Sequence, residues 1–281
     1  MPSLLIILLL AVVQGAAELL PVSSSAHVIL VEHWLGLDPT TPAMTLLLVM
    51  LHTGTMFAVI VYFWHAWRRR LFSGDRRQFL GAVFLATAAT GVVGGALLFL
   101  IEKVLLKGSP HAAVEQLFGN LPLVALSLFA VGIMIVISGQ KERRSNRPIS
   151  TGSALFIGAI QGLCLPLRGF SRSGATISTA LLNGVRRSTA EEFSFALAVV
   201  LTPAVLVREA LRFWREHSAL ASDSVQNTLL LCTAGMVLAF LAGLVALRLL
   251  SNWLENGRWS WFGYYCVGLS GLVLLTYYQN P

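Results

Sequence analysis

Apolar runs dominate the chain, and short polar gaps separate them. Crossing the hydrocarbon core of a bilayer takes about twenty residues in a helix. Six runs reach this length, at 44–67, 79–101, 120–138, 193–211, 228–250 and 261–278. The pattern therefore predicts six full membrane-spanning helices.

Two further regions, 3–37 and 153–183, are apolar but are broken near their middles by proline, glycine and serine residues. Each is predicted to form two half-length helices joined by a polar elbow. The first region could also be taken for a secretory signal. No Lys or Arg precedes its apolar stretch, however, so cleavage is not expected.

The composition agrees with a membrane protein, because 56% of the 281 residues are hydrophobic and only 12% are charged. A soluble domain carries about a quarter charged residues. The net charge of +7 comes from basic residues in the gaps between apolar runs, not from a basic face with stacking aromatics, so no nucleic-acid partner is expected. Cys164, Cys232 and Cys266 are far apart in the sequence and are interpreted as packing residues.

The basic gaps also predict orientation. Lys and Arg collect on the cytoplasmic side of membrane proteins, and the gaps at 68–78 and 139–150 are strongly basic. With both inside, the first broken region enters from outside and returns there, whereas the second enters from inside. The same count leaves 212–227 and the C-terminus outside and Arg258 inside.

The two broken regions resemble each other. A Gln-Gly pair is followed by Leu-Pro and then by a serine cluster, once within 14–26 and again within 161–175. Three full spans follow each region, and an odd number of spans inverts the second copy. The prediction is one all-α polytopic membrane domain over 1–281, an inverted-topology repeat of about 1–140 and about 150–281. Each half has a broken re-entrant helix pair plus three transmembrane helices, and the elbows face one another across a polar pocket.

The first elbow combines groups that can bind and attack an anion. Gln14 and Glu18 lie one turn apart, and Ser24 and His27 share a face of the helix that starts after Pro21, with a serine as its N-cap. A carboxylate, a hydroxyl and an imidazole at a helix N-terminus suit nucleophilic attack on an anion. The alternative is that the serines only cap the helix and the histidine is merely buried. Intramembrane carboxylates are costly and usually functional, which favours the first interpretation.

The second elbow centres on Arg172, between Ser171 and Ser173 and close to Gly174 and Thr176. A guanidinium can hold phosphate oxygens in bidentate fashion. A structural ion pair between Arg172 and Glu18 is the alternative. The two interpretations are compatible if a resting pair opens when phosphate arrives.

Four stretches, 18–27, 52–64, 169–178 and 192–195, resemble the BacA-type undecaprenyl-diphosphate phosphatases. The resemblance covers nearly the whole chain in order. It implies removal of one phosphate from undecaprenyl diphosphate, which recycles the lipid carrier for cell-wall polymers. It also implies a divalent cation, Mg²⁺ or Ca²⁺, and an active site at the outer face of the bacterial inner membrane.

The resemblance also implies roles for residues. Ser24 matches the favoured nucleophile, His27 an acid/base or competing nucleophile, Glu18 an acidic residue that shares the cation, and Arg172 the phosphate-binding arginine. Further candidates for substrate binding are Gln14, Ser23, Ser25, Arg168, Ser171, Ser173, Gly174 and Thr176. Gln14 stands where many members have Glu, which removes one potential metal ligand. Arg168 stands where Pro-Gly is usual before the motif, and it is either a second phosphate clamp or a cytoplasm-directed basic residue.

Two other functions fit the same architecture. Inverted repeats with broken helices are typical of secondary transporters, so the chain could carry an anion or flip the lipid. A noncatalytic scaffold would leave Glu18 and Arg172 as a structural pair. The small residues Gly91, Gly94, Gly95 and Gly132 allow a homodimer, although internal packing is the preferred interpretation. The loops 102–119 and 212–227 carry mixed charges and could form amphipathic surface helices.

Overall fold

The computed structural model describes residues 3–37, 41–72, 76–105, 120–141, 147–216 and 222–279. In these ranges every element longer than an isolated bridge is a helix. The elements are α1 (Leu4–Leu19), α2 (Ser24–Trp34), α3 (Pro42–Leu71), α4 (Arg76–Leu100), η1 (Ile101–Leu105), α6 (Leu121–Lys141), α7 (Thr151–Leu163), α8 (Arg172–Leu182), α9 (Arg187–Glu216), α10 (Ser222–Glu255) and α11 (Trp259–Gln279). The all-helical prediction is confirmed.

Four helices in the described residues are long and apolar enough to cross a membrane. They lie at Met44–Leu71, Arg76–Lys103, Leu121–Gln140 and Thr228–Glu255. The other two predicted spans correspond to α9 and α11, which run for 30 and 21 residues but do not meet the same criterion. In α11, Trp and Tyr near both ends replace more apolar residues, as is common at membrane interfaces. The chain is therefore a multi-pass membrane protein.

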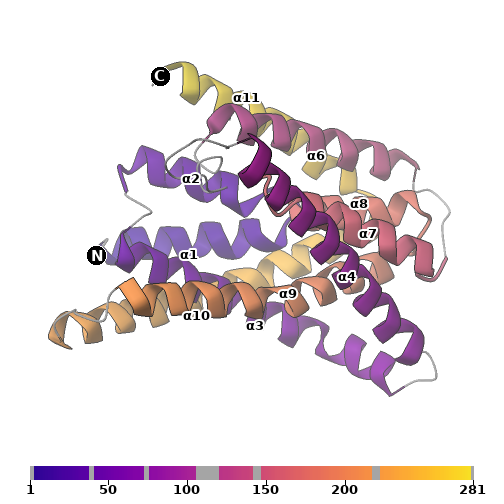
Figure 1. The fold of residues 1–281 in the computed structure, drawn as a ribbon, viewed down its shortest axis with the longest axis horizontal. Coiled ribbons are helices and arrows are strands. Elements are labelled where there is room, and N and C mark those ends of the chain that lie inside the picture. The colour runs from indigo at the N-terminus through magenta and orange to yellow at the C-terminus, as the bar shows by residue number, and fades with distance from the viewer. Residues whose placement is uncertain are drawn as a thin grey trace.

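The two broken regions fold as helix pairs joined by elbows. In the first, α1 ends at Leu19, just before Pro21, whose ring cannot continue a helix. In the second, the segment between α7 and α8 contains Gly169 at φ +91°. Figure 1 shows that α1 and α2 extend from the elbow toward the side of the N-terminus, whereas α7 and α8 extend toward the opposite side.

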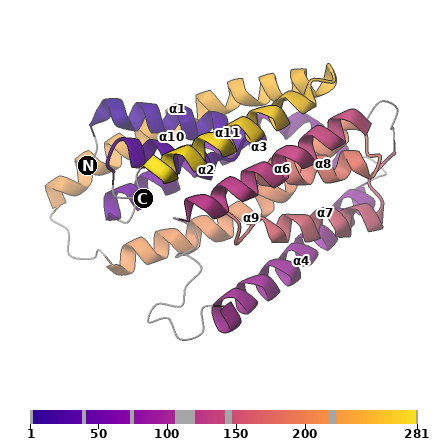
Figure 2. The same ribbon diagram turned by 90° about the horizontal axis from the view of Figure 1, so that it is seen from above.

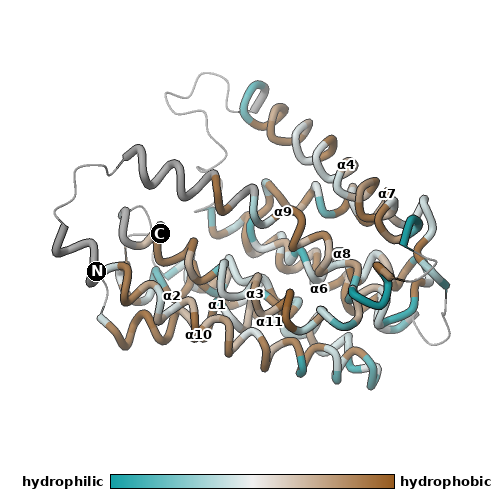
Figure 3. The backbone as a smooth tube through the Cα atoms, turned by 90° about the horizontal axis from the view of Figure 1, so that it is seen from below, coloured by the Kyte–Doolittle hydropathy of each residue, from teal (hydrophilic) through white to brown (hydrophobic). Residues whose placement is uncertain are grey.

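The basic gaps meet at one end of the molecule. Figure 3 shows hydrophilic segments gathered at the end opposite the two chain termini, with apolar helix midsections between. Contacts join the segments there. Arg187 donates to the carbonyl of Glu255 at 2.6 Å, and Arg70 forms an ion pair with Glu192 at 2.6 Å. Among the described residues, these contacts bring the C-terminal ends of α3 and α10 to the first turns of α9, as expected for segments on one side of a membrane.

Close contacts between helices depend on glycine. A Cβ at Gly15 in α1 would lie 2.7 Å from the Ala239 carbonyl of α10, and one at Gly162 in α7 would lie 2.9 Å from Gly94 N of α4. Figure 2 shows α4 at the edge of the bundle, beside α7. Gly132 packs on Gly263 between α6 and α11, so the internal packing predicted for Gly94 and Gly132 is confirmed. For Gly91 and Gly95 that prediction is wrong, because both are exposed and a Cβ there would have no atom within 4 Å.

Other predictions for the loops and the cysteines have mixed outcomes. Cys232 and Cys266 are buried, Cys164 is half-buried, and all three are free thiols, as expected for packing residues. Most of 102–119 lies outside the described residues. In 212–227 the prediction of a separate surface helix is wrong, because α9 continues to Glu216 and α10 begins at Ser222. The spanning helices extend beyond their apolar windows there.

Candidate functional site

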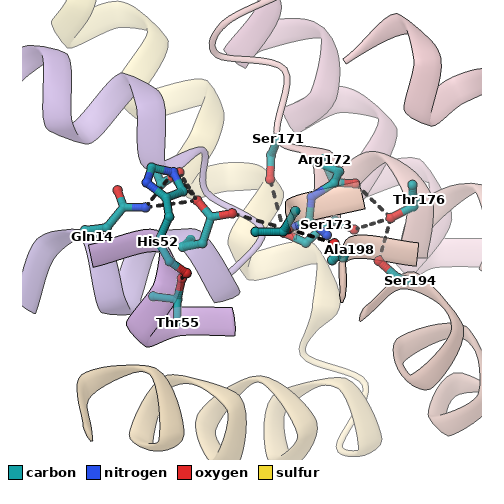
Figure 4. A network of polar contacts seen from close by, with 12 residues as sticks. Gln14, His52, Thr55, Ser171, Arg172, Ser173, Thr176, Ser194 and Ala198 are labelled. Carbon is teal, nitrogen blue, oxygen red and sulfur yellow. Dashed lines mark hydrogen bonds and ion pairs between the residues drawn. The ribbon is translucent and has the colours of Figure 1, made fainter. Parts of the chain in front are cut away.

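The two elbows meet through direct hydrogen bonds. Arg172 Nη2 donates to Glu18 Oε1 at 3.3 Å, and Ser173 Oγ donates to the Leu20 carbonyl at 3.3 Å. The Gly169 N–H donates to Ser25 Oγ at 3.3 Å. Figure 4 shows Gln14 and His52 on one side of this junction and Ser171, Arg172 and Ser173 on the other. Segments about 150 positions apart in the sequence therefore form one polar site.

Glu18 is the centre of the site. Its Oε2 accepts hydrogen bonds from Ser24 Oγ at 2.5 Å and from Gln14 Nε2 at 3.2 Å, while Oε1 accepts from Arg172. The side chain of Glu18 is 19% exposed and that of Arg172 is 24% exposed. The spacing of four residues in α1 puts Gln14 on the face of Glu18, as predicted. The carboxylate therefore touches the predicted nucleophile and the predicted phosphate-binding group together.

His52 is a site residue for which the sequence suggested no role. Its Nδ1 donates to the Leu48 carbonyl at 2.8 Å, so in the neutral ring Nε2 is free to accept from Gln14 Nε2 at 3.1 Å. The same Nε2 is 3.7 Å from Glu18 Oε2. An ionisable residue inside the apolar run 44–67 was the available signal, because such residues are rare in spanning helices and often functional.

Close packing of α3 on α10 fixes the position of His52 relative to its neighbouring helices. A Cβ at Gly54 would lie 2.2 Å from the Met236 carbonyl of α10, so only glycine allows this approach. Thr55 follows and donates to the His52 carbonyl at 2.9 Å. The motif at 52–55 therefore combines a polar side chain with the contact that holds its helix in place.

The start of α2 is strained and lacks a side-chain cap. Ser23 is the N-cap residue, and it is the only non-glycine residue of the described ranges with a positive φ, at 66°. Such backbone conformations cost about 1–3 kcal/mol and often occur at functional sites. The Ser23 hydroxyl contacts Ser25 Oγ at 3.2 Å instead of capping the helix. The N-cap position is as predicted, and the first N–H groups of α2 receive no side-chain cap.

In the second elbow, Ser171 caps α8 and accepts from the Gly174 N–H at 3.3 Å. This cap fixes the residue that follows it, Arg172, at the first helical position. The Nη1 atom of Arg172 is buried without a hydrogen-bond partner. Because an unpaired buried guanidinium nitrogen is costly, a ligand oxygen at this position would be strongly stabilised.

The other predicted substrate-binding groups of this elbow have structural contacts. Thr176 is fully buried and its hydroxyl lies 2.6 Å from Ser194 Oγ in α9. Ser173 and Ser171 are also buried, and Gly174 is packed so closely that a Cβ would lie 2.9 Å from Ile135 Cδ1. These residues orient the elbow and bring Arg172 to Glu18.

His27 and Arg168 lie toward other neighbours. His27 Nδ1 donates to the Ser23 carbonyl at 2.8 Å, so its neutral Nε2 accepts from Tyr265 OH at 2.7 Å, and the two rings stack. Both hydrogen bonds recorded for His27 therefore lead away from Ser24 and Glu18. Arg168 interacts electrostatically with Glu32 of α2. The sequence left open whether Arg168 is a phosphate clamp or a cytoplasm-directed residue, and the structure gives it a carboxylate neighbour in α2.

The donor set fits a cation only if substrate completes its coordination. In the described residues no group of three or more His, Cys, Asp or Glu side chains could hold a metal ion. Mg²⁺ is commonly held by one or two carboxylates together with substrate phosphates and water. Glu18 supplies one carboxylate, and the hydroxyl oxygen of Ser24 is beside it, whereas Gln14 turns its amide nitrogen toward Glu18. A cation shared with a phosphate ligand is compatible with this set.

Known proteins are similar to this chain over nearly its whole length. The family described as bacitracin resistance protein BacA matches residues 7–272. The chain belongs to the BacA family. It is 55% identical to undecaprenyl-diphosphatase 2 of Acinetobacter baylyi, over 96% of this chain and 97% of that protein. It is 35% identical to undecaprenyl-diphosphatase of Gluconacetobacter diazotrophicus, over 95% and 94%. Both elbows lie inside the BacA-family match.

Proposed function

We propose that this BacA-family protein hydrolyses undecaprenyl diphosphate to undecaprenyl phosphate and inorganic phosphate. This reaction recycles the lipid carrier for bacterial cell-wall synthesis. The names of the relatives support the substrate. The observation that carries the proposal is the meeting of the elbows, where one carboxylate joins a serine hydroxyl to an arginine.

The diphosphate binds where Arg172 now meets Glu18. Arg172 Nη1 has no partner in the structure, and the uncapped N–H groups of α2 carry the positive end of a helix dipole. Incoming phosphate oxygens replace Glu18 as the ligand of the guanidinium. The polyprenyl tail lies between the spanning helices, in contact with membrane lipid.

Ser24 is the nucleophile and Glu18 is its base. The hydroxyl already donates to Glu18 Oε2 at 2.5 Å, so the proton passes to the carboxylate as Ser24 Oγ attacks the terminal phosphorus. The new Oγ–phosphorus bond forms while the bond from phosphorus to the bridging oxygen breaks, and undecaprenyl phosphate leaves. Water then hydrolyses the phosphoserine and releases inorganic phosphate.

A divalent cation shared by Glu18 and the substrate would offset the charge that develops on the phosphoryl oxygens. His52 holds Gln14, and Gln14 in turn donates to Glu18. These two residues orient the carboxylate toward Ser24. His27 is proposed to act through the backbone of Ser23, to which it donates a hydrogen bond.

We also propose the predicted repeat, with halves of about 1–140 and 150–281. Helix α1 packs on α10 whereas α7 packs on α4, and α6 packs on α11. Gly15 and Gly162, which follow equivalent glutamines, make the two close contacts. The first helix of each half therefore packs on a spanning helix of the other half, and this exchange supports an inverted repeat. The basic end then faces the cytoplasm and the site opens to the periplasmic side of the inner membrane. A homodimer stays a prediction.

The test is phosphate release from a polyprenyl diphosphate by purified protein in detergent, with Mg²⁺, with Ca²⁺ and with chelator. We expect cation-dependent release, and a loss of about tenfold or more in Arg172→Lys, which keeps the charge but lacks the bidentate fork. Arg258→Lys, at the basic end, is the matched control and should leave release unchanged. Lipid movement in proteoliposomes without phosphate release would overturn the proposal and favour a transporter.

A further inference from the structure

A polar cavity lies at the basic end and includes no residue of the elbows. Its volume is about 210 Å³. The lining combines three arginines with an apolar floor and consists of Arg70, Gln78, Phe79, Ala82, Arg147, Pro148, Ile149, Arg186 and Thr189. The described lining residues include no carboxylate. The reaction proposed above uses none of these side chains.

The backbone holds two of the arginines as neighbours. The Arg147 N–H donates to the Gly184 carbonyl at 3.1 Å, and the Arg186 N–H donates to the Arg147 carbonyl at 3.2 Å. A parallel bridge between Arg147 and Val185 completes the contact. These backbone contacts place Arg147 and Arg186 in one short segment, and both side chains line the cavity. An anion in the cavity would be attracted by their guanidinium groups.

The third arginine is fixed on the other wall. Arg70 Nε forms an ion pair with Glu192 at 2.6 Å, and Arg70 Nη2 donates to Thr189 at 3.3 Å. The guanidinium lies 5.5 Å from the ring centroid of Phe79. Glu192 therefore pairs with Arg70 from outside the lining. The walls come from four segments of the chain, at Arg70, 78–82, 147–149 and 186–189.

The lining of the cavity suits a group that is charged at one end and apolar at the other. Ala82 and Ile149 are buried, and Phe79 is half-buried beside them. The Gln78 side chain donates to the Ile149 carbonyl at 3.3 Å and ties α4 to the segment before α7. Arg147 and Arg186 are exposed, so they stand at the entrance.

We propose that this cavity binds a phosphate group, presented by an anionic phospholipid headgroup or as inorganic phosphate. Guanidinium groups hold phosphate oxygens in bidentate geometry, and arginines at the cytoplasmic surface attract anionic lipid. The apolar floor would receive the glycerol end of a lipid, whereas inorganic phosphate would occupy the arginine rim alone. The site goes beyond the hydrolytic reaction and does not depend on it.

The experiment compares two double variants of the full-length protein. Arg147→Gln with Arg186→Gln removes two charges from the cavity. Arg76→Gln with Arg77→Gln removes two exposed charges at the same end that do not line it. One arm measures retention of phosphatidylglycerol against phosphatidylcholine by native mass spectrometry. The other arm measures the shift in unfolding temperature caused by inorganic phosphate relative to chloride at equal ionic strength.

We expect the cavity variant to lose at least about fivefold in binding, since each arginine near the surface contributes on the order of a fivefold factor. The control variant should bind as the unmodified protein does. Loss in the lipid arm assigns the phosphate to a headgroup, and loss in the phosphate arm assigns it to the free ion. Equal losses in both variants, or no loss in the cavity variant, would overturn the proposal. If the glutamine variant does not fold, Arg147→Lys with Arg186→Lys replaces it. This variant keeps the charge but lacks the bidentate fork of arginine, so it is also expected to lose binding.

Discussion

At the scale of single residues, the site depends on how Glu18 shares its oxygens. Oε2 accepts from Ser24 and Gln14, and Oε1 accepts from Arg172. These contacts keep a charged group stable at a depth where an unpaired carboxylate would be costly. In the proposed mechanism, the carboxylate accepts the proton of Ser24 once phosphate has displaced the arginine.

His52→Ala tests whether Gln14 needs its partner. Removal of the ring takes away one of the two acceptors of the Gln14 amide, so Gln14 is held less firmly against Glu18 and the carboxylate is less well oriented. We expect kcat to fall about tenfold, with little change in KM, because ring removal affects the orientation of the base and not the binding of phosphate. Phosphate release measured over a range of substrate concentrations separates the two parameters.

The control for His52→Ala is Thr53→Val, one position further along α3. The Thr53 hydroxyl donates to the Val49 carbonyl of its own helix, so its loss should leave kcat unchanged. Equal losses in the two variants would show that α3 was disturbed as a whole. A drop confined to His52→Ala with a matching rise in KM would instead make His52 a substrate contact.

At the scale of elements, the elbows depend on glycines that bring helices together. A Cβ at Gly158 would lie 2.1 Å from the Ala86 carbonyl, between α7 and α4. Gly158→Ala is therefore expected to destabilise the protein by about 1–3 kcal/mol or more, because backbone on both sides must shift. Gly152→Ala, in the same helix with open space at its Cβ, should be neutral or slightly stabilising. Thermal unfolding in detergent measures both, and equal unfolding temperatures would contradict this packing.

The sequence predicted the elements better than the contacts between them. Apolar run length and Pro21 gave the spans and the first elbow, since these are local properties. Gln14 and Glu18 were paired correctly because helical spacing alone brings them together. His27 was expected beside Ser24, but its partner Tyr265 lies 238 positions away, and His52 joins the site from another helix. Such partners follow from tertiary packing, which no local pattern specifies.

At the scale of the whole molecule, charge separates the two ends. The described arginines at 68–70, 147, 186–187 and 258 lie at one end, with the N-terminal side of α1 and the C-terminal side of α2 at the other. From the positive-inside rule we propose that the first end is cytoplasmic. The cavity lined by Arg70, Arg147 and Arg186 lies at that end, and the elbows lie between the two ends.

Cysteine labelling in spheroplasts tests this orientation. His33→Cys lies in the exposed last turn of α2, and Asn256→Cys lies in the exposed turn between α10 and α11. A membrane-impermeant maleimide should label the first in intact spheroplasts and the second only after permeabilisation. The unmodified chain controls for Cys164, Cys232 and Cys266. The reverse labelling pattern would place the basic end outside.

The central claim is that Ser24 attacks phosphorus with Glu18 as its base. The most direct measurement is phosphate release from a polyprenyl diphosphate by the variants Ser24→Ala and Glu18→Gln. The control variant is Ser270→Ala, because the buried Ser270 hydroxyl donates to the Val267 carbonyl of its own helix. We predict losses of about 10³-fold or more for Ser24→Ala and about 10²–10⁴-fold for Glu18→Gln, with Ser270→Ala unchanged. Near-normal release by Ser24→Ala would contradict the account and would point to His27 or to water as the nucleophile.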